Sequence, residues 1–100
     1  MPLDPDVAGF VDLLRRIEAL LVVSDARYWA GQIAACRQIA EKSDGYGVIR
    51  FLSLFGGMGS LNDVVLTRGG KILESENDVF SGLLSEAHGL AQALARDAGL

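Results

Sequence analysis

The spacing of the apolar residues limits the fold of this chain more than any other feature of its sequence. Over residues 6–23 they recur every three or four positions, as on one face of an amphipathic helix. The same spacing predicts a second helix over about residues 26–42 and a last helix that ends near Ala98. The three stripes consist of Phe10, Leu13, Leu14, Ile17, Leu20 and Leu21, then Trp29, Ile33, Cys36 and Ala40, then Val79, Leu83, Ala87, Leu90 and Leu94. We therefore expect three long helices in one folding unit.

Residues 46–55 form a shorter segment that is apolar on nearly every side. A short apolar run can be a buried strand, but the glycine pair that follows favours a helix with a C-terminal stop. A helix that is apolar on most sides lies in the centre of a core or against a partner. Phe51 and Leu54 are therefore candidate contacts for a partner protein or for a second copy of the chain.

The segment between the third and the last helix contains two short β-prone runs, residues 64–67 and 71–73, on either side of Gly69 and Gly70. These runs form either a small hairpin or an irregular segment. The predicted fold is therefore mainly all-α, a single compact four-helix domain over residues 1–100 with a short irregular or hairpin segment before the last helix. The candidate N-cap residues are Asp4 or Asp6 for the first helix, Ser24 or Asp25 for the second, and Ser75 or Asn77 for the last.

Composition and charge exclude several classes of protein. Half of the residues are apolar and 22% are charged, which excludes a disordered chain. The net charge of −4 argues against binding to nucleic acid or to an anionic membrane. One cysteine excludes an intramolecular disulfide. One cysteine and one histidine are too few ligands for structural zinc, so we predict no metal and no cofactor. The chain has no apolar run near the ~20 residues that cross a bilayer, and no signal-peptide pattern, so we expect a cytoplasmic location.

The most unusual stretch is the sequence Gly-Gly-Met-Gly-Ser-Leu-Asn-Asp at residues 56–63, which we call the glycine-rich loop. Glycine-rich loops before helices can bind phosphate through their backbone N–H groups. This loop lacks the lysine of a phosphate-binding loop, and the carboxylate of Asp63 would repel an anion at a helix start. The candidate ligand-binding residues are Gly56, Gly57, Met58, Gly59, Ser60, Asn62 and Asp63.

The alternative for the glycine-rich loop is a structural connector. The pattern Ser60-x-x-Asp63 is typical of a helix cap in which the serine hydroxyl meets the backbone N–H of residue 63. The glycines would then let the backbone turn sharply between packed elements. This interpretation predicts that Ser60 and Asp63 bond to the backbone and that Met58 is buried. A ligand-binding loop would instead leave Asn62 and Asp63 open to solvent in a pocket.

Residues 55–63, Phe-Gly-Gly-Met-Gly-Ser-Leu-Asn-Asp, resemble the signature of a family of small bacterial proteins known only as a domain of unknown function. The leucine-rich first helix and the pair Trp29-Ala30 are also similar to members of that family. The similarity covers about residues 13–66. The resemblance implies a bacterial origin and a compact, mainly helical domain, and it implies no activity.

A few further residues are candidates for chemistry or for contact. His88 is the only histidine and shares a helix face with Ser85, but the pair lacks an oxyanion hole and an orienting acid, so we interpret His88 as an ordinary surface residue. Cys36 lies on an apolar stripe, where a thiol acts as a small hydrophobe. Tyr28 points away from that stripe and is a candidate interface anchor. Acidic residues ahead of the last helix are interpreted as partners of the helix dipole: Glu74, Glu76 and Asp78.

The sequence therefore favours a non-enzymatic protein–protein interaction module. Reactive groups are few, while the third helix has more apolar surface than a peripheral helix needs. An immunity-type or regulatory protein fits the acidic charge, because acidic surfaces attract basic partners, and a self-associating dimer fits equally well. The candidate interface residues are Tyr28, Phe51 and Leu54. The alternative is a small-molecule-binding protein or a minor enzyme that uses the glycine-rich loop.

Overall fold

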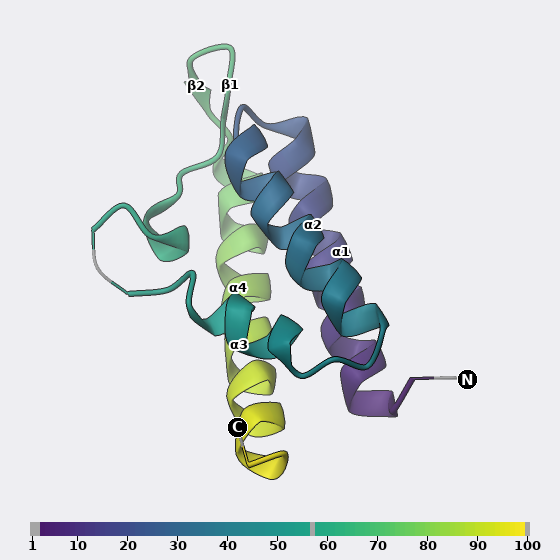
Figure 1. Ribbon diagram of the computed structural model, residues 1–100. Helices are drawn as coiled ribbons and strands as arrows, with labels where there is room; N and C mark the ends of the chain where they lie inside the picture. The colour runs from purple at the N-terminus through teal and green to yellow at the C-terminus, as the bar shows by residue number, and fades with distance from the viewer. Residues whose placement is uncertain (1–2, 57, 100) are drawn as a thin grey trace.

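Residues 3–56 and 58–99, which the computed structural model describes, form four α-helices and a two-stranded hairpin (Figure 1). The helices are α1 (Pro5–Val23), α2 (Arg27–Glu41), α3 (Tyr46–Leu52) and α4 (Glu74–Asp97). A short 3-10 helix, η1 (Leu61–Asp63), and the strands β1 (Thr67–Arg68) and β2 (Lys71–Ile72) lie between α3 and α4. The predicted mainly helical fold, with a short hairpin between the third and the last helices, is confirmed.

Helix α1 is central to the arrangement because it packs against both α2 and α4. Helix α3 contacts α2 on one side and α4 on the other. The start of α1 and the end of α4 lie at one end of the molecule, whereas the α1–α2 turn and the hairpin lie at the opposite end (Figure 1). Between α3 and the hairpin, residues 58–66 stand out to one side of the helices (Figure 1).

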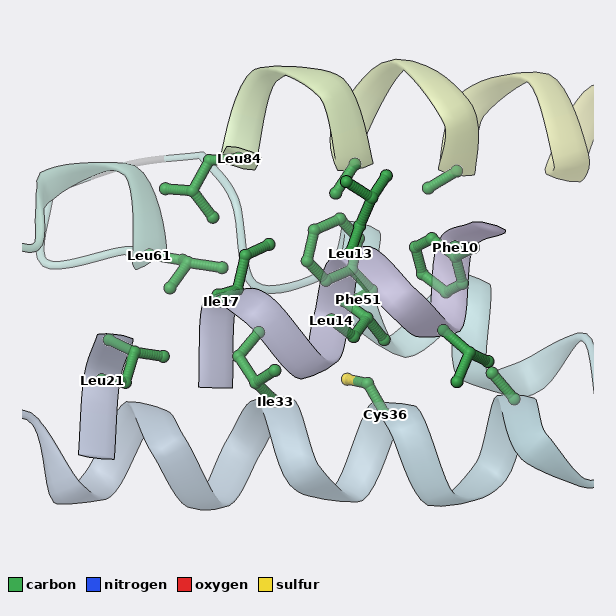
Figure 2. Close-up of a cluster of buried hydrophobic side chains, with 14 of the residues drawn as sticks. Phe10, Leu13, Leu14, Ile17, Leu21, Ile33, Cys36, Phe51, Leu61 and Leu84 are labelled. Carbon is green, nitrogen blue, oxygen red and sulfur yellow. The ribbon is translucent and has the colours of Figure 1, made fainter. Parts of the chain in front are cut away.

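The core is built from the predicted stripes of α1 and α2, from a displaced stripe of α4, and from the segment before the hairpin. In α4 the predicted central stripe is wrong, because Val79 is 56% exposed and the buried side chains are Phe80, Leu84, Ala87, Ala91 and Ala95. Figure 2 shows side chains of α1 meeting side chains from each of the other α-helices. The rings of Phe10 and Phe51 meet edge to face with centroids 5.3 Å apart, which places α3 within the core. Leu61 of η1 and Leu66 are also fully buried. Because burial of each such side chain contributes about 1.5–3 kcal/mol, these two leucines hold the segment against the helices.

A close approach between α2 and α3 explains one glycine that the sequence pattern does not single out. A Cβ atom on Gly47 would lie 2.8 Å from the backbone nitrogen of Ala40 and 2.9 Å from the carbonyl oxygen of Cys36. Both are backbone atoms of α2, so they cannot move aside without distorting that helix. Helix α3 therefore approaches α2 this closely only because residue 47 has no side chain.

Helix α3 ends at Leu52 and not at Phe55 as predicted. After Leu52 the backbone tightens, because Leu54 donates to the carbonyl oxygen of Phe51 at 3.0 Å in a three-residue turn. The hydroxyl of Ser53 donates to the carbonyl oxygen of Arg50 at 2.5 Å and competes for the end of the helix. The chain thereby turns away from α2 before it reaches the glycine-rich loop.

The predicted N-cap is confirmed for α1 and wrong for the other two long helices. The carboxylate of Asp4 accepts a hydrogen bond from the N–H of Asp6 at 2.9 Å, and Pro5 occupies the first helical position. Helix α2 begins after Ala26 and α4 begins after Leu73, both without a side-chain cap. Three of the four predicted caps fail because their side chains bond elsewhere: Ser24 donates to the carbonyl oxygen of Leu21 at 3.1 Å, and Asp25 and Asn77 bond to the hairpin region. The fourth, Ser75, lies within α4, which already begins at Glu74.

The hairpin pairs Thr67 with Ile72 and Arg68 with Lys71 in antiparallel register. Its two turn glycines have φ values of 58° and 80°, as a tight two-residue hairpin turn requires. Asp25 in the α1–α2 turn fixes the hairpin from the side: its N–H donates to the carbonyl oxygen of Thr67 at 2.9 Å, and its carboxylate accepts from the N–H of Gly69 at 3.2 Å. A hairpin this short is not stable alone, so these bonds account for its position.

Candidate functional site

A groove of about 880 Å³ lies between the first half of α4 and residues 55–72. Its apolar lining comes from both sides and consists of Phe55, Val64, Val65, Ile72, Phe80 and Leu84. Its polar lining consists of Asn62, Glu74, Asn77, Asp78, Ser81, Ser85 and His88. The groove therefore combines apolar walls with a row of polar and acidic side chains along α4, which we call the α4 groove.

The wall opposite α4 is positioned by three anchors. Phe55 packs edge to face on Phe51 with ring centroids 5.0 Å apart, and its other neighbour is the ring of His88 at 4.6 Å. The N–H of Leu61 donates to the carbonyl oxygen of Leu54 at 2.9 Å, and the Leu61 side chain enters the core. With Leu66 as the third anchor, Val64 packs partly buried against the core, whereas Val65 remains 58% exposed.

Asn77 of α4 ties this wall to the start of the helix. Its amide oxygen accepts from the N–H of Leu66 at 2.8 Å, while its amide nitrogen donates to the carbonyl oxygens of Leu66 at 3.0 Å and Leu73 at 2.8 Å. Leu73 also donates its own N–H to the carbonyl oxygen of Leu66 at 3.0 Å. We call these contacts the Asn77 clasp. The clasp satisfies backbone groups at the point where no regular strand pairing continues, so it fixes the width of the groove at this end.

The charged groups of the α4 groove are of one sign. Glu74 and Asp78 are exposed on α4 one turn apart, and the lining contains no lysine or arginine. None of the ion pairs among residues 3–56 and 58–99 involves either carboxylate. Both charges therefore face solvent along the groove without an internal partner.

The glycine-rich loop does not contain the tight backbone passage that the connector interpretation predicted. Gly56 and Gly59 have φ values of 95° and 76°, which favour glycine, but a Cβ atom at either would meet nothing within 4 Å. These glycines are explained by backbone conformation and not by crowding. Gly57 lies outside the described residues.

The polar groups of the glycine-rich loop bond within the loop, Asp63 to the backbone as the connector interpretation predicted and Ser60 not. The Ser60 hydroxyl donates to the amide oxygen of Asn62, whereas the N–H of Asp63 bonds to the carbonyl oxygen of Ser60 at 3.0 Å, so the predicted serine cap is absent. The carboxylate of Asp63 accepts from the N–H of Gly59 at 2.8 Å, which turns it back onto the backbone. Met58 is fully exposed, against the burial expected of a connector. Of these loop residues, only Asn62 lines the α4 groove.

The three candidate interface residues have different environments. Tyr28 is 68% exposed, with its ring against Trp29 at 5.2 Å between centroids. Leu54 is partly buried against the core. Phe51 is fully buried between two phenylalanine rings, so its proposal as a surface contact is wrong for the folded chain. Of the two explanations for an all-round apolar helix, a central position is the one that applies to Phe51.

His88 and Cys36 lie in different surroundings. His88 is half-buried beside Phe55 and is less exposed than predicted, and no hydrogen bond joins it to Ser85 among the described residues. Cys36 is fully buried as predicted, and this burial raises the pKa of its thiol to about 11 against the opposing charge of Arg50. Within the described part of the chain, no three His, Cys, Asp or Glu side chains are grouped to hold a metal ion.

Among the described residues, no helix is both long enough and apolar enough to cross a bilayer.

The functional residues that sequence reasoning missed are those of the α4 groove. Val65 and Ile72 were placed in β-prone runs without a surface role, and Glu74 and Asp78 were explained by the helix dipole alone. A signal was present, because two apolar side chains flank a turn in a segment too short to bury them. For Asn77 the sequence carries no such signal, since the clasp depends on contacts across eleven residues.

Fold and site together define a small, mainly helical domain with a clasped hairpin and an open groove that is apolar and acidic. The family described as Domain of unknown function (DUF6966) matches residues 23–74, slightly more than half of the chain. The chain therefore belongs to this family, and the expected relationship to a domain of unknown function is confirmed. The matched range includes the groove wall over residues 55–72 and ends where α4 begins. Neither the curated proteins nor the solved structures contain a match to this chain.

Proposed function

We propose that this protein is a non-enzymatic interaction module that holds a segment of a partner protein in the α4 groove. The observation that carries the proposal is the exposure of the groove's apolar wall: Val65 is 58% exposed and Ile72 is 65% exposed beside each other along one lining. Contiguous exposed apolar groups with a polar rim are typical of protein-binding surfaces. A groove beside a helix is also a common form of peptide recognition site.

A small-molecule site or an enzyme is less well supported. Pockets for small ligands enclose most of the ligand surface, whereas both walls of the α4 groove carry exposed side chains. The glycine-rich loop directs its own carboxylate onto its own backbone, which leaves that backbone N–H unavailable for a ligand. Ser85 and His88 line the groove without an acid that orients the histidine.

The wider role that fits this proposal is a regulatory or immunity-type protein of the bacterial cytoplasm. The acidic net charge of −4 supports a basic partner. A lone cysteine that is fully buried is consistent with a reducing compartment. The bacterial origin follows from the sequence resemblance alone.

Site-specific photocrosslinking tests the groove directly. A photoreactive phenylalanine analogue replaces Val65 in the full chain, in cells that produce the protein naturally. The matched control replaces Val22 of α1, which is 60% exposed but lies outside the α4 groove. We expect a discrete adduct with another protein from position 65 and none of the same mass from position 22. Identical adduct patterns at both positions, or none at position 65, would contradict the proposal.

A further inference from the structure

The α4 groove has a charge pattern that specifies its partner more closely. We infer that the segment bound there carries at least one lysine or arginine beside apolar side chains, and that this cation lies between Glu74 and Asp78. This inference rests on the proposed function. It adds the chemistry of the partner, which exposed apolar walls alone do not determine.

The helix dipole accounts for the position of one of the two carboxylates but not of the other. A helix dipole favours negative charge in the first turn, and Glu74 lies in the first turn of α4. The dipole effect falls off beyond that turn, so it does not account for Asp78, which begins the second turn. Asp78 therefore extends the negative charge along the groove beyond what the stability of α4 requires.

The cations of the hairpin lie outside the α4 groove. The hairpin carries Arg68 and Lys71 close to α4 in the sequence, yet neither lines the groove. Among the described residues neither forms an ion pair with Glu74 or Asp78. The chain does not neutralise its groove, and a bound segment with a cation would do so. A segment with acidic side chains would meet like charge, which costs affinity.

The length of the α4 wall indicates the size of the occupant. The α4 wall runs from Glu74 to His88, which corresponds to about 21 Å at about 1.5 Å per helical residue. An extended peptide covers that length with about six residues, at about 3.3 Å each. Apolar side chains of such a peptide can contact Val65 and Ile72 on one wall while its cation reaches Glu74 and Asp78 at the start of the α4 wall. The occupant is therefore a short linear segment and not a folded surface.

The experiment is a selection of random twelve-residue peptides displayed on phage, with the full chain as the target. Two target variants are used in parallel: the double substitution Val65→Ser and Ile72→Ser, which removes the apolar wall, and its control Val22→Ser and Val23→Ser on α1. All four side chains are more than half exposed, so both variants are expected to fold. Peptides enriched on the wild type and the α1 control, but not on the groove variant, define groove-dependent binders.

We expect these binders to contain lysine or arginine above its frequency in the unselected library. Synthetic copies should bind about five- to tenfold more weakly to Glu74→Gln/Asp78→Asn, as expected for the loss of one or two partly exposed ion pairs. The matched control is Glu86→Gln/Asp97→Asn, which removes the same net charge from exposed positions of α4 outside the groove. This control should leave affinity within about twofold.

The outcomes separate the inference from the proposed function. Groove-dependent peptides without a basic excess, or equal losses in the two charge variants, overturn the inference and leave the groove as a binding site. The absence of any groove-dependent peptide overturns the proposed function as well. Should Glu74→Gln/Asp78→Asn fail to fold by circular dichroism, the single variant Asp78→Asn replaces it, because Asp78 lies outside the first turn. Its binding must then fall measurably for the inference to stand.

Discussion

The face formed by α1 and α2 and the face formed by α4 and residues 55–72 use their charges in opposite ways. On the first face the guanidinium of Arg37 donates to Glu18 at 2.7 Å and to Glu41 at 3.0 Å. These bonds, that to Glu18 first, raise the pKa of Arg37 above its ordinary value. Arg15 reaches Glu41 at 2.5 Å, so four charged side chains are joined in one network.

On the second face the carboxylates of Glu74 and Asp78 have no such partner among the described residues, and apolar side chains stand beside them in solvent. Stability alone explains the charge network on the α1–α2 face, because its four members are paired within the chain. It does not explain the α4 groove. The difference supports the proposal that the α4 groove binds a partner, and it predicts that substitutions on the two faces have different consequences.

The largest expected effect comes from Gly47, where α3 packs against the backbone of α2. Gly47→Ala places a methyl group 2.8 Å from a backbone atom of α2, and we expect it to lower the free energy of unfolding by about 3 kcal/mol. Gly31→Ala is the matched control, because a Cβ atom there meets nothing within 4 Å. In the interior of α2 it should raise stability by about 0.5–1 kcal/mol. Urea unfolding followed by circular dichroism measures both.

Opposite signs for the two glycine variants would establish that α3 is held against α2 by backbone contact. If both variants shift the urea midpoint in the same direction, helix propensity and not packing decides the effect at Gly47. The packed side of the molecule would then be less constrained than its contacts indicate, and the contrast with the α4 groove would weaken.

A smaller effect is expected where the packed part of the fold supports the groove. Asn77→Ala removes three hydrogen bonds of the clasp and leaves the N–H of Leu66 without its partner, while the carbonyl oxygen of Leu66 keeps its bond from Leu73. We expect a loss of about 2 kcal/mol in unfolding free energy, the usual penalty for an unsatisfied buried polar group. The N–H of Leu66 should also exchange with deuterium faster than in the wild type, because the clasp protects it.

The control for the clasp is Asn62→Ala, since Asn62 is exposed and its only side-chain hydrogen bond is with the Ser60 hydroxyl among the described residues. This variant should change stability by less than about 0.5 kcal/mol. Equal losses for the two asparagine variants would show that the clasp does not hold the groove wall.

The sequence was sufficient to predict those features that depend on neighbouring residues. Helical periodicity identified the three long helices, the glycine pair at residues 56 and 57 favoured a helix for the segment before it, and a glycine pair between two β-prone runs indicated the hairpin. The first-helix cap was also predictable, because Asp4 has no competing partner nearby in the fold. Even the relationship to a domain of unknown function was visible in residues 55–63, which include the glycine-rich loop.

The features that failed depend on contacts between distant residues. Asp25 and Asn77 were predicted to cap helices, but each bonds to the hairpin region, across 44 and 11 residues respectively. Gly47 was overlooked because nothing in its own segment records how closely α2 approaches. The α4 groove was overlooked for the same reason, since its two walls come from segments with separate patterns. Local patterns therefore determine which helices and strands form, while contacts between distant residues determine which side chains remain exposed.

The smallest expected effect tests whether water reaches the side chains buried between α1 and α2. Burial raises the pKa of the Cys36 thiol from 9.0 to about 11, so the folded chain retains this proton at pH values where the unfolded chain loses it. The associated stability is fully present below pH 9 and declines as the pH rises toward 11, because the unfolded state then gains by ionisation. In Cys36→Ala this decline is absent. The difference in unfolding free energy between wild type and variant should therefore fall by about 1 kcal/mol from pH 8 to pH 10, measured by urea unfolding at each pH. A difference that stays constant over this range would mean that water reaches the thiol, and the interface between α1 and α2 would then be as open to solvent as the α4 groove.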